Sequence, residues 1–209
     1  MLFKEENMKK GANKPSSQTS VFIEKGFKDT IKFHLDEIKD LYLEDQTPWI
    51  IGYSGGKDSS AVLQLIWISL TKLAQEQLTK PIYIISSDTL VENPVVSAWV
   101  SNSLNCMKKT AKKDGLPFHA HLLTPEISDT FWVNLIGKGY PAPRTKFRWC
   151  TDRLKILPSN KFITDKVSKH GEAIVVLGTR KAESTTRART MEKHAINKIR
   201  DRLTPNLSL

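Results

Sequence analysis

The six residues at positions 54–59, Ser-Gly-Gly-Lys-Asp-Ser, combine the side chains that a phosphate-binding loop requires. Gly55 and Gly56 let backbone N–H groups approach an anion without obstruction by a Cβ atom. Lys57 supplies a positive charge, and Ser54 and Ser59 supply short hydroxyl donors. The Walker motif differs, because its glycines stand further apart and it ends in Gly-Lys-Ser/Thr. The loop therefore predicts phosphate binding of another type.

Asp58 stands among these groups although a carboxylate repels phosphate. It either caps the following helix or helps to hold Mg²⁺. The loop lies between the apolar run 49–53, typical of a buried strand, and residues 59–76, whose apolar side chains have helical spacing. A helix that begins here adds unpaired N–H donors and the positive end of its dipole. We therefore expect a nucleotide-binding site here.

A second candidate site surrounds Cys150. Five basic residues flank this cysteine: Arg144, Lys146, Arg148, Arg153 and Lys155. Guanidinium groups bind phosphate oxygens in a fork, and the rings of Phe147 and Trp149 can stack a base. Cationic neighbours also favour the thiolate, which attacks sulfur or binds iron. The alternative for a lone cysteine is a buried, inert side chain.

Two further candidates follow predicted strands. Asp88 closes the strand run 82–87 and could take a ribose or a metal, or could simply form a turn or cap a helix. Gly178 allows close backbone approach, and Arg180 and Lys181 can reach a triphosphate; a basic surface turn is the alternative. His119 and His121 share a strand face without a third ligand, so we expect them to be packed or at the surface.

The elements that must position these residues alternate along the chain. Helices are predicted at about 21–44, 59–76, 93–114 and 159–170. Strands are predicted at 49–53, 81–85, 118–123 and 173–178. This alternation predicts an α/β fold, a parallel sheet with helices on both faces. Trp67 and Trp99 lie in helical patterns, which places them in the core, and Cys106 is expected to be a packed side chain of the helix at 93–114.

The chain divides into a polar N-terminal lead-in at 1–20 and one nucleotide-binding domain at 21–209. Within the domain, residues 126–158 break the alternation with glycines, prolines and aromatic residues. Structureless insertions of this length are usually functional, as a lid or a substrate loop; a surface excursion without a role is the alternative.

Composition narrows the function classes. Hydrophobic residues make up 39% of the chain, and no apolar run approaches the roughly 20 residues that span a bilayer, so we expect no membrane partner. Two cysteines and no visible secretory signal suit a reducing, cytoplasmic location. The net charge of +10 arises within residues 144–209, which hold 16 Lys and Arg against 6 Asp and Glu. Such a basic region favours a polyanion such as DNA, or nucleotide phosphates.

Ser-Gly-Gly-Lys-Asp-Ser resembles the PP-loop of the ATP pyrophosphatase superfamily, which implies an adenine nucleotide α-hydrolase-like fold. The segments 139–144, 146–155 and 177–184, with Ser87-Asp88-Thr89, resemble the DndC-type DNA phosphorothioation proteins and their SspD-type relatives. The likeness covers about residues 20–205. It implies an ATP pyrophosphatase that activates DNA backbone phosphate for sulfur incorporation, in defence against foreign DNA. It also implies a cysteine desulfurase and other phosphorothioation proteins as partners.

Many members of that family carry a four-iron four-sulfur cluster held by four cysteines. Cys150 matches one cluster position, but this chain has only two cysteines, so a cluster requires cysteines outside it. We expect Lys57, Asp58, Cys150 and Arg153 to carry the chemistry. One alternative is a phosphoadenylyl-sulfate or adenylyl-sulfate reductase, although residues 190–209 lack the redox cysteine usual there. The other is a nucleotide-sensing DNA-binding subunit without turnover.

Overall fold

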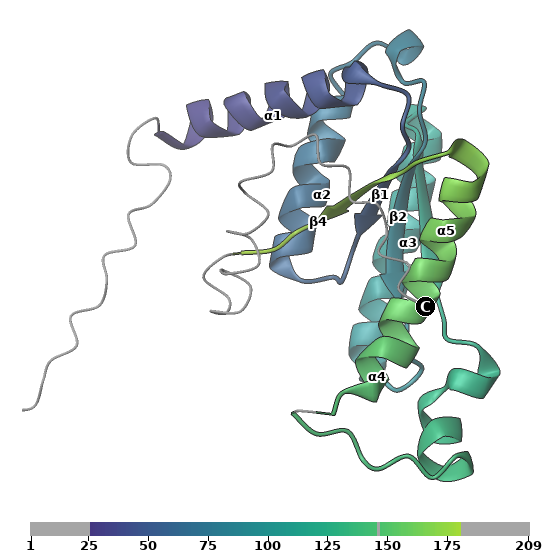
Figure 1. Cartoon of the computed structure of the whole chain (residues 1–209). Coiled ribbons are helices and arrows are strands. Elements are labelled where there is room, and N and C mark those ends of the chain that lie inside the picture. Colours follow the sequence, from purple (N-terminus) through teal and green to yellow (C-terminus); the bar gives the residue numbers. More distant parts are fainter. Residues whose placement is uncertain (1–25, 146, 181–209) are drawn as a thin grey trace, which may run out of the picture.

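The computed structural model describes residues 26–145 and 147–180, and its centre is a four-stranded parallel sheet (Figure 1). The strands are β1 (Trp49–Gly52), β2 (Ile82–Ser87), β3 (Phe118–Leu123) and β4 (Ile174–Leu177). Their order across the sheet is β3-β2-β1-β4, with every pair parallel. Each strand lies within two residues of its sequence-predicted bounds.

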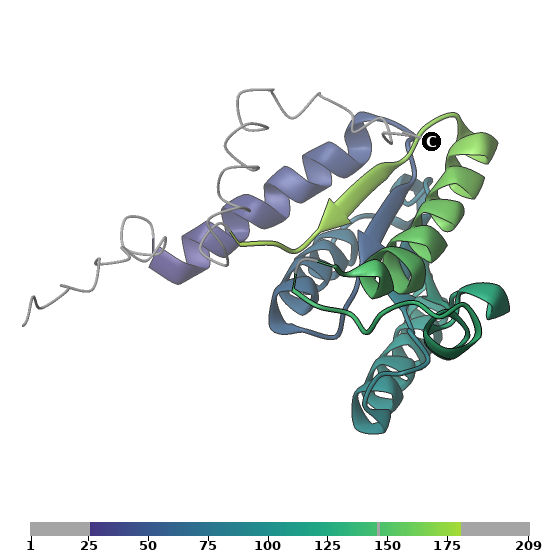
Figure 2. The same ribbon diagram turned by 60° about the horizontal axis from the view of Figure 1, so that its bottom comes forward.

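Helices cover both faces of this sheet. Helices α2 (Lys57–Leu70) and α3 (Pro94–Asp114) lie on one face, and α1 (Gly26–Glu44) packs against α2. Helix α5 (Leu157–His170) covers the opposite face, as the turned view in Figure 2 also shows. The α/β class with a parallel sheet and helices on both faces is thus confirmed.

Side-chain alternation along the strands divides the two faces. Phe118 of β3 points toward the main core, where its ring stacks on Trp67 of α2 with centroids 4.3 Å apart. Tyr83 of β2 points the other way and meets Phe162 of α5 edge-on, with centroids 5.8 Å apart. The predictions for Trp67 and for the strand pattern are confirmed, because successive strand residues face opposite sides.

The strand order sets the place where a ligand is expected. In the order β3-β2-β1-β4, the chain moves outward on one side of β1 and then returns to its other side. Doubly wound sheets bind ligands at such a reversal, outside the carboxyl ends of the strands. The reversal here lies between β1 and β4, so residues 54–59 and Gly178 both follow strands that end at this point.

Residues 126–158 are not structureless, which corrects that part of the prediction. They contain a 3₁₀ turn, η2 (Ile127–Asp129), and a π-helical turn, η3 (Val133–Gly137). A short helix, α4 (Trp149–Thr151), and a π-helical turn, η4 (Asp152–Ile156), lead directly into α5. Pro158 does not end this helical stretch; it lies in the first turn of α5, directly after the π-helical turn η4.

One other helix prediction is corrected at its end. Helix α2 ends at Leu70 rather than at residue 76, and a separate 3₁₀ turn, η1 (Gln75–Gln77), follows it. None of the helices within the described residues combines the length and apolar character that crossing a bilayer requires.

Trp99 and Cys106 were expected to be packed, but both are exposed on α3. The buried stripe of α3 consists of Val100, Leu104 and Ala111, at steps of four and seven residues. One residue turns the helix by about 100°, so Trp99 falls beside this stripe and Cys106, two residues after Leu104, falls opposite it. The helical period was recognised, but its buried face was assigned wrongly.

A buried lysine joins α1 to the start of β2. Lys80 is 1% exposed, and its Nζ donates a hydrogen bond to Oδ1 of Asp45 over 2.9 Å. The same ammonium lies 4.9 Å above the ring of Tyr42 and 5.1 Å from that of Trp49. The Tyr42 hydroxyl donates to the Lys80 carbonyl over 2.9 Å. The charge is therefore satisfied within the protein rather than by water.

This pair makes an acid-sensitive contribution to stability. Burial raises the pKa of the Asp45 carboxyl, but hydrogen bonds from Lys80 and Thr47 outweigh burial and hold the pKa below its usual value of 3.8. Because the folded-state pKa is lowered, the contribution is present above about pH 4 and is lost as the pH falls through the lowered value. Asp45→Asn should cost on the order of 3 kcal/mol at pH 7, since Lys80 then lacks its partner.

Urea unfolding of the wild type and of Asp45→Asn across pH 7 to pH 2 tests this expectation. The difference in unfolding free energy should shrink below about pH 4. Asp36→Asn is the matched control, because Asp36 pairs with Lys39 on the exposed surface of α1 and should matter little. A difference that stays constant over the whole range would show that Asp45 does not stabilise the fold through its charge.

Candidate nucleotide-binding site

The loop between β1 and α2 is held closed by its two serines. The Ser54 N–H donates to Oγ of Ser59 over 3.2 Å, and the Ser59 hydroxyl donates to the Gly56 carbonyl over 3.0 Å. The two hydroxyl oxygens are 3.1 Å apart. Gly55 has a φ of +73°, in the left-handed region that glycine adopts without strain. Ser59 is buried, so its hydroxyl shapes the loop, while Ser54 remains exposed.

The amino end of α2 presents free backbone donors at this loop. The cap residue Gly56 makes no side-chain capping bond. Ser60 is the first residue whose N–H has an acceptor in the helix, the Gly56 carbonyl at 3.0 Å. The N–H groups before it belong to the unpaired first turn of the helix, where anions bind. The predicted loop geometry, with a glycine turn leading into a helix start, is present.

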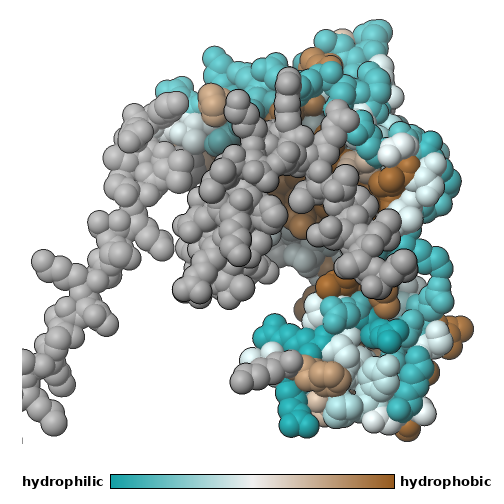
Figure 3. All heavy atoms as spheres, in the orientation of Figure 1, coloured by the Kyte–Doolittle hydropathy of each residue, from teal (hydrophilic) through white to brown (hydrophobic). Residues whose placement is uncertain are grey.

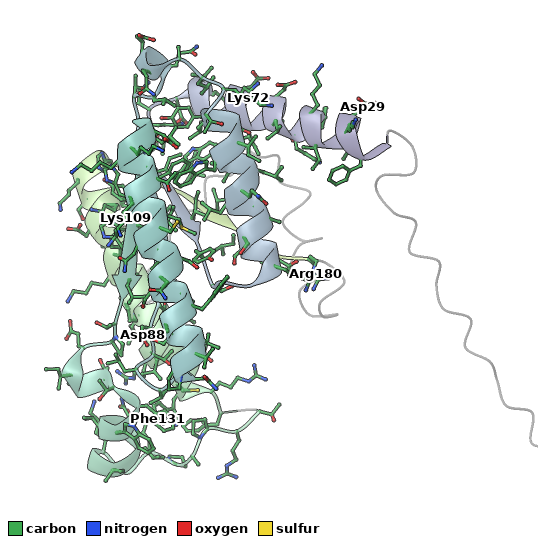
Figure 4. All side chains as sticks on the ribbon, turned by 180° about the vertical axis from the view of Figure 1, so that it is seen from behind. Asp29, Lys72, Asp88, Lys109, Phe131 and Arg180 are labelled. Atoms are coloured by element: carbon green, nitrogen blue, oxygen red, sulfur yellow. The ribbon has the colours of Figure 1, made fainter. Side chains whose placement is uncertain are left out.

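Three charged side chains converge at the same point. Oδ2 of Asp58 accepts a hydrogen bond from Nε of Arg180 over 3.0 Å, and Nζ of Lys57 lies 3.8 Å from the same oxygen. Figure 4 shows Arg180 beside the amino end of α2. Asp58 thus links the loop to the segment after β4 rather than capping the helix. Lys57 is 74% exposed at its side chain and is free to meet a ligand.

Gly178 explains how Arg180 comes so close. A Cβ atom on Gly178 would lie 2.6 Å from the Asp58 carbonyl oxygen and 2.9 Å from the Ser59 nitrogen. The chain leaving β4 therefore lies against the backbone of the first turn of α2. Lys181, predicted to act beside Arg180, lies outside the described residues.

The donor set suits a nucleotide with Mg²⁺ better than an all-protein metal site. Among residues 26–145 and 147–180, no three His, Cys, Asp or Glu side chains come together as a metal cage. Mg²⁺ commonly takes one or two carboxylates and completes its shell with phosphates and water. Asp58, half-exposed beside the loop, fits that role as a single carboxylate.

Asp88 organises the turn between β2 and α3. Its Oδ1 accepts a hydrogen bond from the Leu90 N–H over 2.9 Å, and its Oδ2 accepts one from the Ser97 hydroxyl over 3.4 Å. The turn role weighed for Asp88 is therefore present at the carboxyl edge of the sheet. The ribose or metal role remains a prediction.

The insertion lies at this same edge of the sheet. Ser87 and Ser159 place their hydroxyl oxygens 3.4 Å apart, and Lys155 pairs with Glu92 over 3.0 Å. The first contact joins the carboxyl end of β2 to the first turn of α5, and the second joins the turn before α3 to η4. Figure 1 accordingly shows residues 126–158 beyond the ends of β2 and β3.

Trp149 is packed, which corrects its predicted role in stacking a base. It is 6% exposed, and its Nε1 donates to the Pro141 carbonyl over 2.9 Å. Its ring stacks on Phe131, with centroids 5.4 Å apart, and meets Tyr140 edge-on at 5.5 Å. The aromatic residues at these positions therefore form a small core that holds the insertion together.

The predicted basic residues divide into two groups. Arg153 donates to Oδ1 of Asp129 over 3.2 Å and to the Tyr140 hydroxyl over 3.4 Å, so its guanidinium braces the insertion. Lys155 likewise has an acidic partner, because it pairs with Glu92. Arg144 and Arg148 are exposed and have no acidic partner among the described residues, although Arg148 donates to the Thr145 carbonyl.

Lys146, the remaining predicted cation of the insertion, is not among the described residues.

Hydrophobic side chains also reach the surface of the insertion among hydrophilic ones, as the lower part of Figure 3 shows. The largest exposed fractions there belong to Ile127, Ile136 and Trp132.

The cysteines do not form a cluster site. Cys150 is half-buried in α4, whereas Cys106 is exposed on α3, and both are free. A four-iron four-sulfur cluster needs four thiolate ligands, and the chain contains two cysteines in total. The residues of this chain therefore do not fit such a cluster by themselves.

Together these features define an α/β protein with a glycine-rich loop, the candidate phosphate site, at the reversal point of a parallel sheet. No family model matches the chain. It is 27% identical over 157 residues to the uncharacterised protein MJ0066 of Methanocaldococcus jannaschii, which covers 75% of this chain and 28% of that protein. Among solved structures, the U34-tRNA thiolase NcsA from Methanococcus maripaludis, with its four-iron four-sulfur cluster, aligns at a TM-score of 0.45 and 12% identity. This alignment covers 82% of this chain and 52% of that one, so the chain spans less than two thirds of either protein.

Proposed function

We propose that the chain binds ATP at residues 54–59 and splits it into AMP and pyrophosphate, to activate DNA backbone phosphate for sulfur incorporation. The observation that carries the proposal is the convergence of free helix N–H groups, Lys57, Asp58 and Arg180 at the reversal point of the sheet. The resemblance of the loop to the PP-loop, and of the segments 139–155 and 177–184 to DndC-type proteins, supports the choice of reaction.

In this proposal, the helix N–H groups and Lys57 stabilise the negative charge that grows on the leaving pyrophosphate. Mg²⁺, when bound with the nucleotide, would neutralise phosphate charge, with Asp58 as its protein ligand. An oxygen of the DNA phosphate attacks the α-phosphorus, the bond to the bridging oxygen breaks, and pyrophosphate leaves. A sulfur nucleophile can then attack the DNA phosphorus and displace AMP, and the DNA oxygen that had attacked the α-phosphorus leaves as part of AMP.

The support for DNA as the acceptor is electrostatic and positional. Arg144 and Arg148 are exposed on the insertion, at the edge of the sheet where the phosphate loop lies. The excess of positive charge in residues 144–209 favours a polyanion in the same way. A cysteine desulfurase and other phosphorothioation proteins are the proposed partners, as the resemblance to DndC-type proteins implies.

Product analysis of ATP turnover, with and without DNA, tests the proposal. We expect AMP and pyrophosphate in equal amounts, with DNA and a sulfur donor raising the rate. Production of ADP and phosphate would overturn the reaction type. Tight ATP and DNA binding with no AMP under any condition would favour a nucleotide-sensing subunit instead. If transfer RNA stimulates ATP turnover and DNA does not, the proposed cleavage of ATP stands, but the acceptor is RNA instead of DNA.

The two cysteines provide a matched pair for the sulfur step. We propose that Cys150, at the insertion, takes the outer sulfur of the donor's persulfide and carries it as a persulfide, while the donor leaves as a thiol and exposed Cys106 on α3 has no role. The outer sulfur attacks the DNA phosphorus as AMP leaves. A thiol reductant then breaks the S–S bond, which releases the phosphorothioate and leaves a disulfide between Cys150 and the reductant. Cys150→Ser should therefore eliminate phosphorothioate in DNA, measured by mass spectrometry of digested DNA, and should leave ATP binding intact. Cys106→Ser should leave both unchanged. Normal phosphorothioate levels with Cys150→Ser would remove this cysteine from the sulfur route.

A further inference from the structure

Trp99 of α3 lies against the tip of the phosphate loop. Its Cδ1 and Nε1 atoms are 3.4 and 3.6 Å from the position that a Cβ atom on Gly55 would take. Cγ2 of the neighbouring Val100 lies 3.0 Å from the same position. Helix α3 thus abuts the loop with Val100 inside the core and Trp99 outside it, next to the place where a bound phosphate is expected.

The indole is nevertheless exposed. Trp99 is 62% exposed, and within residues 26–145 and 147–180 its N–H has no hydrogen-bond acceptor. Val95 and Val96, four and three residues earlier, share its side of the helix and are 76% and 48% exposed. We call these three side chains the Trp99 shelf. Exposed aromatic and aliphatic side chains gathered at a polar loop indicate a ligand that covers them.

The turn before α3 also holds apolar groups outward. Leu90 has a φ of +61°, a left-handed conformation that is unusual for a bulky residue, and its side chain is 53% exposed. The hydrogen bond from its N–H to Asp88 holds the turn in this shape. Backbone strain of this kind clusters at ligand sites, and here it lies between β2 and the Trp99 shelf.

We propose that the Trp99 shelf stacks the nucleobase of the nucleotide whose phosphates the loop holds. This inference rests on the proposed binding of ATP at residues 54–59. A flat, exposed indole beside a phosphate site offers what a base requires: an aromatic face for stacking and apolar surface around it. The loop binds the phosphates, and the shelf binds the other end of the same molecule.

Three probes with Mg²⁺ test the proposal on the full chain: ATP, inorganic tripolyphosphate, and a single-stranded oligodeoxyadenylate. Trp99→Ala should raise the dissociation constant of ATP by about five- to a hundredfold, the range for one stacked base. Tripolyphosphate has no base, so its affinity should stay within about twofold. Trp99→Phe keeps an aromatic face and should retain most of the ATP affinity.

Trp132→Ala is the matched control, because Trp132 is also exposed, at 57%, but lies in the insertion. It should leave ATP and tripolyphosphate affinities unchanged. If Trp99→Ala weakens only the oligonucleotide, the stacked base belongs to a nucleic acid strand instead of ATP. Equal losses for ATP and tripolyphosphate, or no loss for any probe, would overturn base stacking. A wild-type chain that binds neither ATP nor tripolyphosphate would overturn the phosphate-loop proposal itself.

Discussion

Lys57→Ala is expected to slow pyrophosphate release from ATP by about a hundred- to a thousandfold, the usual cost of removing one preorganised donor at a developing charge. The Lys57 ammonium is exposed and 3.8 Å from Asp58, so its removal leaves no cavity. The effect should therefore appear in turnover and leave the midpoint of thermal unfolding unchanged. Pyrophosphate release under saturating ATP is the direct measurement.

Lys72→Ala provides the control for Lys57. Lys72 is an exposed lysine just past the opposite end of α2, as Figure 4 shows. Lys72→Ala therefore removes the same single positive charge as Lys57→Ala, but at a position far from the loop. It should leave the rate within about twofold, because exposed charges a helix length apart are screened by salt. Equal rates for the wild type and Lys57→Ala would remove Lys57 from the reaction.

The second large effect is expected at Gly178. In Gly178→Ala the new methyl group would lie 2.6 and 2.8 Å from the carbonyl oxygen and carbon of Asp58. Backbone atoms cannot move aside as a flexible side chain does, so the end of β4 and the first turn of α2 must separate. We expect a loss of about 1–3 kcal/mol in unfolding free energy, the usual cost of overpacking. ATP affinity should fall as well, because Arg180 moves with this segment.

Gly137→Ala is the control, because it shows whether replacing any glycine by alanine has the same effect as the close contact at Gly178. A Cβ atom there would have Val133 Cγ1 at 3.8 Å as its nearest neighbour, which is ordinary van der Waals contact. Chemical unfolding and ATP titration of both variants give the comparison. If Gly178→Ala binds ATP as the wild type does, the close approach of β4 to α2 is not needed for the nucleotide site.

The local features of the site could be predicted from the sequence. The apolar runs that form β1, β2 and β4 are visible in the residues themselves. Strands β1 and β2 are mostly buried, as such runs predict, whereas β3 alternates apolar residues with histidines and exposes one face. The loop at 54–59 was likewise recognisable, since its glycines, serines and lysine are consecutive. The places of Asp88 and Gly178 at strand ends follow from the same pattern.

Contacts between distant segments were not predictable in this way. The sequence places Arg180 and Asp58 122 residues apart, and only the order of the strands brings them to 3.0 Å. The sequence suggested that Trp149 and Arg153 bind a ligand. In the structure, the ring of Trp149 packs against Phe131 and Tyr140, and Arg153 donates a hydrogen bond to Asp129. Nothing in the residue types of the insertion distinguishes an aromatic residue that packs from one that binds.

The sequence by itself therefore determined the parallel α/β class and the glycine turn that leads into α2, because both depend on neighbouring residues and their hydrogen bonds. The tertiary structure alone decided which face of α3 is buried, and with it that Trp99 lies exposed beside Gly55 while Val100 enters the core. A helix repeats every 3.6 residues whatever it packs against, so its period is a local property. Which face of the helix meets the core depends on the sheet and on α2, and these are formed by other parts of the chain.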